Sequence, residues 1–208
     1  MPDAPDQAGL KPAARPQQAA VNFLAHLWLT ERAGLPLVGA VLGDVVRGRL
    51  EGRLPPALEA SIRFHRQVDG ATDRHPLSLA ARARFDNGAR RWSGIVLDVV
   101  HDHALALDWP EQEPLDAFAV RAARAVADPG AWQLAADRPP PDAERFAALL
   151  LSYRDDTGID RALARIASRL RDPAPLLGHA AGWRDHLPAV REDSPRLLAD
   201  LQQLVPAR

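Results

Sequence analysis

Two pairs of potential metal ligands lie at helical i, i+4 spacing in otherwise apolar stretches of this chain. His65 and Asp69 form one pair, and Asp98 and Asp102 form the other. Because residues four apart in an α-helix share a face, both side chains of each pair would point in the same direction. Two such helices can close on one divalent cation. The spacing therefore predicts an all-helical metallohydrolase.

The available ligand types narrow the choice of metal. The chain has no cysteine, which excludes disulfides, thiol catalysis and Cys-ligated zinc. Imidazole together with carboxylate suits Mn²⁺, Fe²⁺ or Zn²⁺, and a set rich in carboxylates favours Mn²⁺ or Mg²⁺. Asp73 continues the stripe of His65 and Asp69, but Pro76 follows it closely. An N-cap for the next helix is therefore an equal alternative for Asp73.

The neighbours of Asp98 are almost all aliphatic. An ionised carboxylate there is costly unless it is paired or bound to a metal. Asp102 lies on the same face, and His103, about 100° further round the helix, can bind the metal or hold a water. His101 points away from this face, so we interpret it as a surface residue. The alternative is an aspartate paired with an arginine and a hydrogen-bonded His103 in the core.

Another acidic residue and several arginines lie near these pairs in the sequence. Asp44 follows a glycine in the apolar stretch GAVLGDVVRG, where small neighbours let a ligand approach closely. Its alternative is a buried pair with Arg47 or the cap of a local turn. Arg47, Arg63 and Arg66 can bind phosphate oxygens, or can form a solvated helix face. His26 lies on an apolar helix, where a histidine is more typical of the core, and we keep it as a secondary candidate.

Length and charge limit the function further. The 208 residues, 22.6 kDa, fit one domain, and the formal net charge of −1 gives no field that favours nucleic acid or an anionic membrane. Residues 47–91, however, carry ten arginines against five acidic residues, which can steer an acidic protein partner. No apolar run approaches the ~20 residues of a membrane span, and no secretory signal is evident. We expect a cytoplasmic protein.

The helical periodicity of the apolar residues and the positions of proline and glycine predict an all-α, single-domain helical bundle. Residues 1–20 are rich in proline and poor in bulky apolar side chains, so we expect a disordered tail before a helical domain over 21–208. Asn22 is the expected N-cap of the first helix. The other expected helices are roughly 37–49, 55–73, 77–108, 114–127, 142–153, 157–170 and 184–203. Residues 91–94 are the expected break within 77–108, with a turn at residues 86–88 as a second possibility.

Four ordered segments resemble the acyl carrier protein phosphodiesterase family, also called acyl carrier protein hydrolases. They are VNFLAHLWL at 21–29, GAVLGDVVRG at 39–48, IRFHRQVDGATDRHP at 62–76 and IVLDVVHDHALALDW at 95–109. A weaker similarity lies at 152–155. Because relatives are expected to begin at Met-Asn-Phe, the resemblance also predicts that residues 1–20 are a dispensable extension, or that translation starts at Val21.

The resemblance implies an HD-like phosphohydrolase fold, Mn²⁺ as cofactor with Mg²⁺ or Fe²⁺ possible, and acyl carrier protein as substrate. The implied reaction cleaves the phosphodiester between the carrier serine and 4′-phosphopantetheine, giving apo carrier protein. Carried over residue by residue, the candidate catalytic residues are Asp44, Asp102 and His103, and the candidate metal ligands are His65, Asp69, Asp98 and Asp102. The doublet is Asp102-His103 here, whereas the wider HD pattern has His-Asp. A nucleotide phosphohydrolase and a non-catalytic carrier-binding protein remain alternatives.

Overall fold

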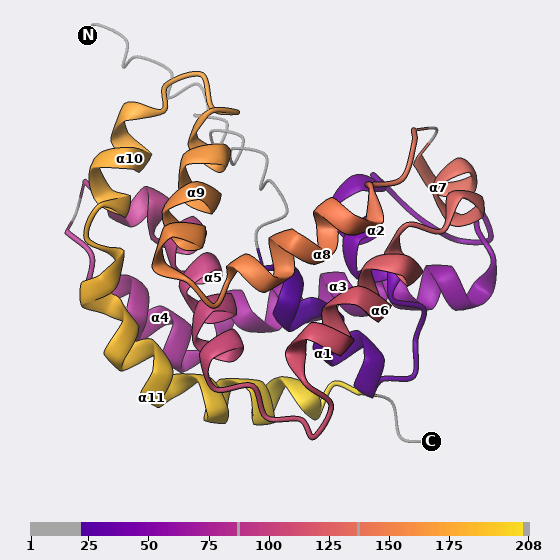
Figure 1. Ribbon diagram of the computed structural model, residues 1–208, viewed down its shortest axis with the longest axis horizontal. Helices are drawn as coiled ribbons and strands as arrows, with labels where there is room; N and C mark the ends of the chain where they lie inside the picture. Colours follow the sequence, from indigo (N-terminus) through magenta and orange to yellow (C-terminus); the bar gives the residue numbers. More distant parts are fainter. Residues whose placement is uncertain (1–21, 87, 137, 206–208) are drawn as a thin grey trace, which may run out of the picture.

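Helix α5, Arg90–Leu107, contacts elements from both ends of the chain in the computed structural model (Figure 1). It packs against α1, Phe23–Arg32, and along α11, Trp183–Gln202. Most of its residues are buried, including Val96, Val99 and Val100. An apolar helix that is covered on nearly every side forms the centre of a globular core. The residues on α5 are therefore held by the rest of the fold.

The structure describes residues 22–86, 88–136 and 138–205. These ranges form eleven helices and no strand, so the all-α prediction is confirmed. The remaining helices are α2 Val38–Val45, α3 Pro56–Arg74, α4 Pro76–Ala83, α6 Leu115–Val126, α7 Pro129–Ala136, α8 Ala143–Ser152, α9 Asp156–Ala167 and α10 Ala174–Ala180. The tail predicted for residues 1–20 lies outside the described ranges. No described helix combines the length and the apolar character needed to cross a membrane.

Most predicted boundaries are close to the observed ones. Helices α3, α6, α8 and α11 begin and end within one residue of the predictions. The prediction for 37–49 is wrong at its end, because α2 stops at Val45 and Val46 is extended with ψ 122°. In the loop that follows, Gly48 and Gly52 have φ of 78° and 79°, which favour glycine. Helices α7 and α10 were not predicted, because eight and seven residues give little periodicity.

The span predicted over 77–108 is two helices rather than one. The predicted break at 91–94 is wrong, since α5 already begins at Arg90. The chain instead leaves α4 at Ala83 and turns through the segment that includes Asp86, in line with the second possibility. Buried Phe85 anchors this turn, with its ring stacked on His186 of α11 at 4.0 Å between centroids. The turn lets α4 and α5 pack against each other.

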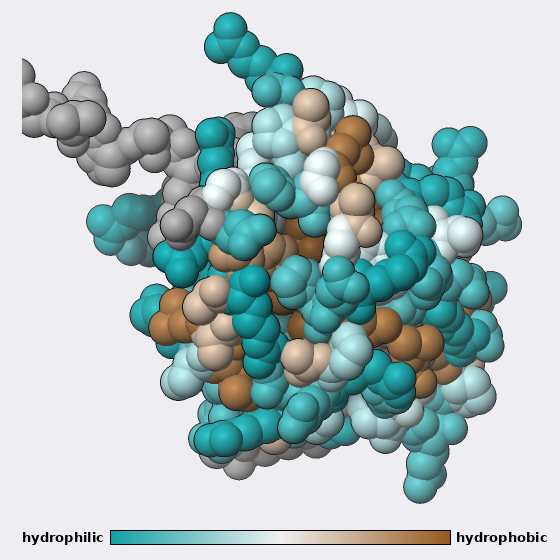
Figure 2. Space-filling model, turned by 90° about the vertical axis from the view of Figure 1, so that its left-hand side faces the viewer, coloured by the Kyte–Doolittle hydropathy of each residue, from teal (hydrophilic) through white to brown (hydrophobic). Residues whose placement is uncertain are grey.

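Hydrophobic side chains on the surface are dispersed. Figure 2 shows the side on which α10 and α11 lie, and its hydrophobic residues are scattered among hydrophilic ones. The large apolar residues that stay most exposed come from different helices, namely Leu79, Leu107, Val120, Leu134, Leu177 and Leu204. Single exposed apolar residues of this kind are normal for a soluble surface. They do not mark a docking site.

Candidate functional site

His26, His65 and Asp69 converge where α1 meets α3. Their ligand atoms all lie within 4.8 Å of one another. Nε2 of His26 is 3.0 Å from Oδ1 of Asp69, and Nε2 of His65 is 3.2 Å from Oδ2 of the same carboxylate. The His65 and Asp69 pair thus lies on one helix face as predicted, and the secondary candidate His26 completes a cluster of three.

The two histidines of this cluster have no conventional hydrogen bonds. Both rings are almost fully buried, with centroids 4.1 Å apart and planes inclined by 30°. Among the described residues, neither nitrogen of His26 or His65 has a hydrogen-bond partner, because the close approach to Asp69 lacks the required direction. Buried polar atoms without partners are rare and costly. Imidazole nitrogens and a carboxylate that converge in this way fit a divalent cation.

Two glycines bring α2 close enough for a fourth group to join the cluster. A Cβ on Gly43 would lie 2.2 Å from Cδ2 of His65, and one on Gly39 would lie 2.2 Å from Oγ of Ser61. Only the missing side chains allow this packing of α2 on α3. Asp44 follows directly, and its Oδ1 lies 3.5 Å from Nε2 of His65. The structure therefore places Asp44 beside the predicted pair.

The charges in this cluster favour a cation. Burial alone would lower the pKa of His65, but the adjacent Asp44 and Asp69 carboxylates raise the pKa to about 9. Burial acts to raise the pKa of Asp69, but the two histidines hold it below its usual value. The pKa of His26 is lowered, by burial and then by His65. The two carboxylates thus stabilise a positive charge at His65. A metal ion bound next to this ring would provide such a charge.

Asp98 lies near this cluster but outside it. Burial and then the negative charges of Asp69, Asp73 and Asp44 raise the pKa of its carboxyl, Arg82 lowers it, and the net result is a pKa of about 7. Asp98 also lines a cavity of about 30 Å³ with His26, toward α11, enough for about one water. We retain Asp98 as a ligand prediction, because negative charges that raise its pKa would also attract a cation.

Asp102, which the sequence predicted as a metal ligand and catalytic residue, lies outside the cluster of His26, His65 and Asp69. Its side chain is fully buried, and Oδ2 and Oδ1 accept hydrogen bonds of 2.9 Å from the backbone N–H groups of Leu24 and Ala25. The carboxylate therefore caps α1, whereas Asn22, the predicted cap, makes no side-chain capping bond. Burial raises the pKa of Asp102 well above its usual value. Asp102 holds the turn that carries His26, and the geometry favours this role over metal binding.

His103 and His101 also lie in other environments. Nδ1 of His103 lies 2.6 Å from the carbonyl oxygen of Tyr153, and Nε2 is 3.6 Å from Oδ1 of Asp156, so the ring faces the junction of α8 and α9. This position matches the core histidine alternative and lies apart from the cluster of His26, His65 and Asp69. His101 is partly buried, with Nδ1 at 2.9 Å from Oγ of Ser194 in α11. The surface interpretation of His101 was wrong.

The predicted phosphate-binding arginines have separate partners. Arg66 donates to the carbonyl oxygens of Val46 and Gly48, at 2.7 and 2.9 Å, and so holds the loop after α2. Arg63 pairs with Glu59 on its own helix at 3.0 Å. Of the three, only Arg47 lies in a cleft next to Asp44. Asp73 pairs with Arg82, and His75 rather than Asp73 caps α4.

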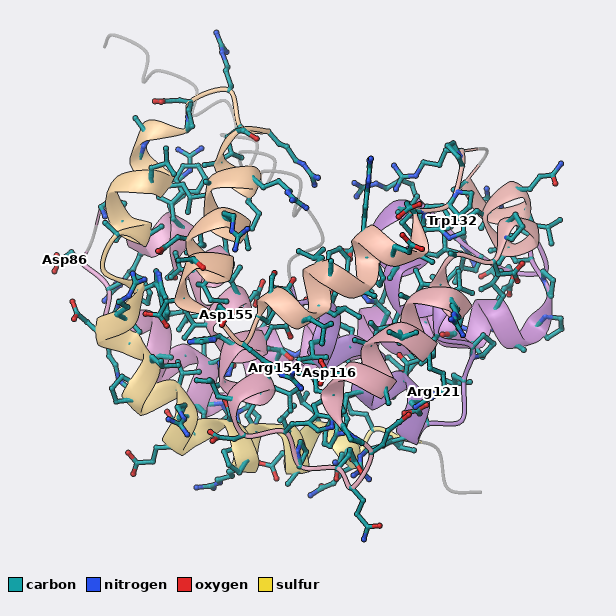
Figure 3. The ribbon with its side chains drawn as sticks, viewed as in Figure 1. Asp86, Asp116, Arg121, Trp132, Arg154 and Asp155 are labelled. Atoms are coloured by element: carbon teal, nitrogen blue, oxygen red, sulfur yellow. The ribbon has the colours of Figure 1, made fainter. Side chains whose placement is uncertain are left out.

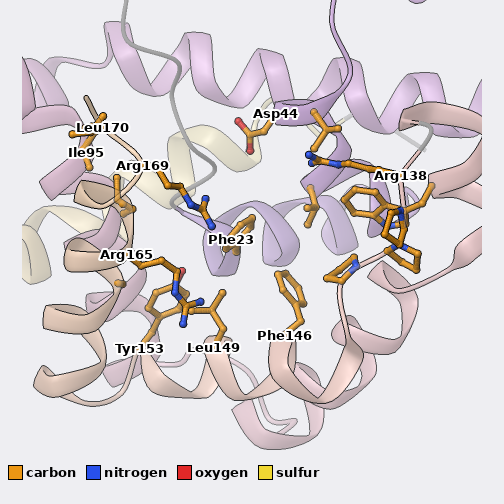
Figure 4. Close-up of a pocket in the computed structure, with 18 of the residues that line it drawn as sticks. Phe23, Asp44, Ile95, Arg138, Phe146, Leu149, Tyr153, Arg165, Arg169 and Leu170 are labelled. Carbon is orange, nitrogen blue, oxygen red and sulfur yellow. The ribbon is translucent and has the colours of Figure 1, made fainter. Parts of the chain in front are cut away.

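A large cleft lies beside Asp44. It has a volume of about 770 Å³ and is lined by parts of α1, α2, α5, α7, α8 and α9 and by the loop before α8 (Figure 4). Five arginines line it, at positions 47, 138, 165, 169 and 171. Apolar side chains, including Phe23 and Phe146, lie between them in Figure 4. The last four arginines were missed because the sequence carries no signal that brings α9, the residues after it and the segment before α8 to one cleft beside α2.

Comparisons with known proteins agree with the sequence resemblance. A family model described as acyl carrier protein phosphodiesterase matches residues 21–201. A protein of that name from Photorhabdus laumondii is 46% identical over 94 residues, which are 45% of this chain and 48% of that protein. One from Yersinia pestis is 47% identical over 94 residues, 45% of this chain and 49% of its own length. The chain thus spans about half the length of these two relatives.

A longer match covers more of both sequences. A protein from Escherichia coli, also named acyl carrier protein phosphodiesterase, is 37% identical over 158 residues, 72% of this chain and 79% of its own length. No solved structure matches this chain.

Proposed function

The chain belongs to the acyl carrier protein phosphodiesterase family, and from this premise we propose that it hydrolyses the phosphodiester linking 4′-phosphopantetheine to the serine of holo acyl carrier protein. The products are apo carrier protein, with a free serine hydroxyl, and 4′-phosphopantetheine. The curated relatives carry the name of this activity. The observation that carries the proposal is the cluster of His26, His65 and Asp69, with Asp44 between it and the cleft.

We propose that His26, His65 and Asp69 hold a divalent cation, with Mn²⁺ first and Mg²⁺ or Fe²⁺ as alternatives. Two imidazoles and a carboxylate are a donor set that suits Fe²⁺, and the further carboxylates of Asp44 and Asp98 suit Mn²⁺ and Mg²⁺. The buried ring nitrogens without hydrogen-bond partners support the assignment. When bound, such a cation polarises a phosphoryl oxygen and lowers the pKa of a water. Asp98 is the proposed additional ligand.

The residues of the chain itself supply the remaining chemistry. Asp44 borders both the metal cluster and the cleft, so its carboxylate can accept a proton from the water that attacks phosphorus. Arg47 lies in the same cleft and can stabilise charge on the phosphoryl oxygens. The bond between phosphorus and the carrier serine oxygen breaks, and that oxygen takes up a proton.

The HD-like classification is part of this proposal. It is supported by the all-helical fold of the described residues, which carries the histidine and aspartate ligands on helices α1 and α3. The Asp102-His103 doublet does not contribute, since Asp102 caps α1 and His103 faces α8 and α9. A nucleotide phosphohydrolase would use the same cluster. A protein that binds carrier protein without cleaving it would need no metal. The metal content of the purified protein therefore distinguishes this alternative from the two hydrolases.

The test is incubation of the full chain with holo acyl carrier protein and Mn²⁺, followed by the mass of the carrier. We expect loss of the prosthetic group, prevention by a chelator, and a rate at least ~10²-fold lower for Asp69→Ala. The matched control is Asp86→Ala, at an exposed aspartate on the outer edge of the molecule in Figure 3. Hydrolysis of nucleotides but not of holo carrier protein would favour the alternative phosphohydrolase.

A further inference from the structure

The five arginines that line the cleft have no acidic partners among the described residues. Arg47, Arg138, Arg165, Arg169 and Arg171 are all exposed, and none pairs with a carboxylate of a described residue. Elsewhere on the described surface, pairing is common. The paired arginines include Arg32, Arg121, Arg154, Arg184 and Arg191, and Figure 3 shows Arg154 beside its partner Asp116.

The cleft arginines lie on opposite walls. Arg165 and Arg169 are one turn apart on α9 and its C-terminal end, and Arg138 lies across the cleft in the segment before α8 (Figure 4). Phe23 and Phe146 lie between the walls, with their rings in edge-to-face contact at 5.3 Å. Among the described residues that line the cleft, Asp44 is the single carboxylate. The cleft thus has two positively charged walls with an apolar strip between them. This strip runs toward Asp44 and the cluster of His26, His65 and Asp69.

We propose that this arginine cleft is the docking surface for the acidic face of the carrier protein. The proposal rests on the function proposed above and names the surface that would recognise its substrate. Acidic side chains of the carrier would pair with Arg165 and Arg169 on one wall and with Arg138 on the other. The prosthetic arm, which is mostly uncharged, would then lie along the apolar strip toward Asp44.

The proposed docking surface differs from the one expected from the sequence, which was the basic stretch of residues 47–91. Several arginines of residues 47–91 already have partners within the chain, among them Arg63, Arg66 and Arg82. A guanidinium that is bound to a carboxylate or carbonyl of its own chain adds little attraction for another protein. Of that stretch, only Arg47 belongs to the arginine cleft. Unpaired charges in a concave site focus the field on an acidic partner.

The experiment measures the binding of apo acyl carrier protein, which has no phosphodiester to cleave. Fluorescence anisotropy of labelled apo carrier protein gives Kd for the full chain and for the double variant Arg165→Glu/Arg169→Glu. We expect Kd to rise at least ~10-fold, because reversal places like charges opposite the acidic carrier. The matched control is Arg124→Glu/Arg196→Glu, which changes the net charge equally at two exposed arginines outside the cleft. Circular dichroism confirms that both variants are folded.

The outcomes separate docking from catalysis. If the cleft and control variants bind apo carrier protein equally well, the docking proposal is wrong, even where holo carrier protein is cleaved. If the cleft variant alone loses binding while the wild type cleaves no holo carrier protein, docking stands and the proposed reaction fails. Loss of affinity for ADP, but not for apo carrier protein, in the cleft variant would mark a small-anion site and overturn the proposal. Asp69→Ala should bind apo carrier protein as the wild type does.

Discussion

The imidazole of His26 stacks on that of His65, although the two residues come from different helices. Two unprotonated rings in this arrangement leave their nitrogens free for a cation, whereas two protonated rings would repel each other. The stack therefore makes metal binding sensitive to the separation of α1 and α3. Substitutions that alter this separation should affect the site even when they change no ligand.

Gly43→Ala should disrupt the site through packing. The added Cβ would lie 2.2 Å from the ring of His65, so either the ring or α2 must move. We expect the free energy of unfolding to fall by about 1–3 kcal/mol, as for other overpacked cores, and Mn²⁺ affinity to fall with it. Chemical denaturation and metal titration measure the two effects. The control is Gly178→Ala on α10, where a Cβ meets no atom within 4 Å, and alanine there should be neutral or slightly stabilising. Equal behaviour of the two variants would refute this packing argument.

His26→Ala should weaken Mn²⁺ binding without a change in the exposed surface. When Mn²⁺ is about 100-fold above Kd, binding stabilises the folded chain by about 2.7 kcal/mol, and a 100-fold loss of affinity reduces this to about 0.4 kcal/mol. Melting curves with and without Mn²⁺ should therefore differ by several degrees for the wild type and by little for the variant. His179→Ala, at a partly buried histidine on α10, is the control. A full Mn²⁺ shift in His26→Ala would remove His26 from the site.

The main effect of Asp102→Ala should be a decrease in the free energy of unfolding. The backbone N–H groups of Leu24 and Ala25 would lose their acceptors inside the core, at a cost of about 1–3 kcal/mol each. Asp102→Asn keeps one acceptor and should lose less stability. We expect the asparagine variant to bind Mn²⁺ more tightly than His26→Ala does, as measured by calorimetry. If Asp102→Asn retains its melting temperature but no longer binds Mn²⁺, then Asp102 is a ligand and its capping role is secondary.

His101 should make the chain less stable in acid. Burial lowers its pKa to about 4 from an ordinary value near 6.5, so between these values the unfolded state binds more protons than the folded state. Stability therefore falls as pH is lowered through this window, by about 2 kcal/mol at pH 5 relative to pH 8. His101→Gln can keep a hydrogen bond to Ser194 and does not titrate. Urea denaturation of both proteins at pH 8 and pH 5 should show a smaller loss for the variant; equal losses would contradict the assignment.

The sequence predicted groups that lie on one element better than groups that come together from several. His65 and Asp69 share a helix, so their spacing was enough to place them together. His26 joins them only because α1 packs on α3, and a single histidine on an apolar helix gives no indication of that contact. The capping contacts of Asp102 could not be predicted for the same reason, since its partners are backbone N–H groups 77 and 78 residues away. The cleft arginines on α9 and just after it could not be predicted for the same reason, because packing between distant helices brings them to the cleft.

The capping of α1 by Asp102 also affects the order in which the chain can fold during synthesis. Asp102 emerges 78 residues after Leu24, the residue whose N–H it accepts. At about 5–20 residues per second, the ribosome needs roughly 4–16 seconds to cover that distance. For that interval the first helix has left the ribosome without the carboxylate that closes its N-terminus. The nascent chain therefore cannot assemble the proposed cation site one helix at a time, because His26 on α1 is held in place only after α5 has been made.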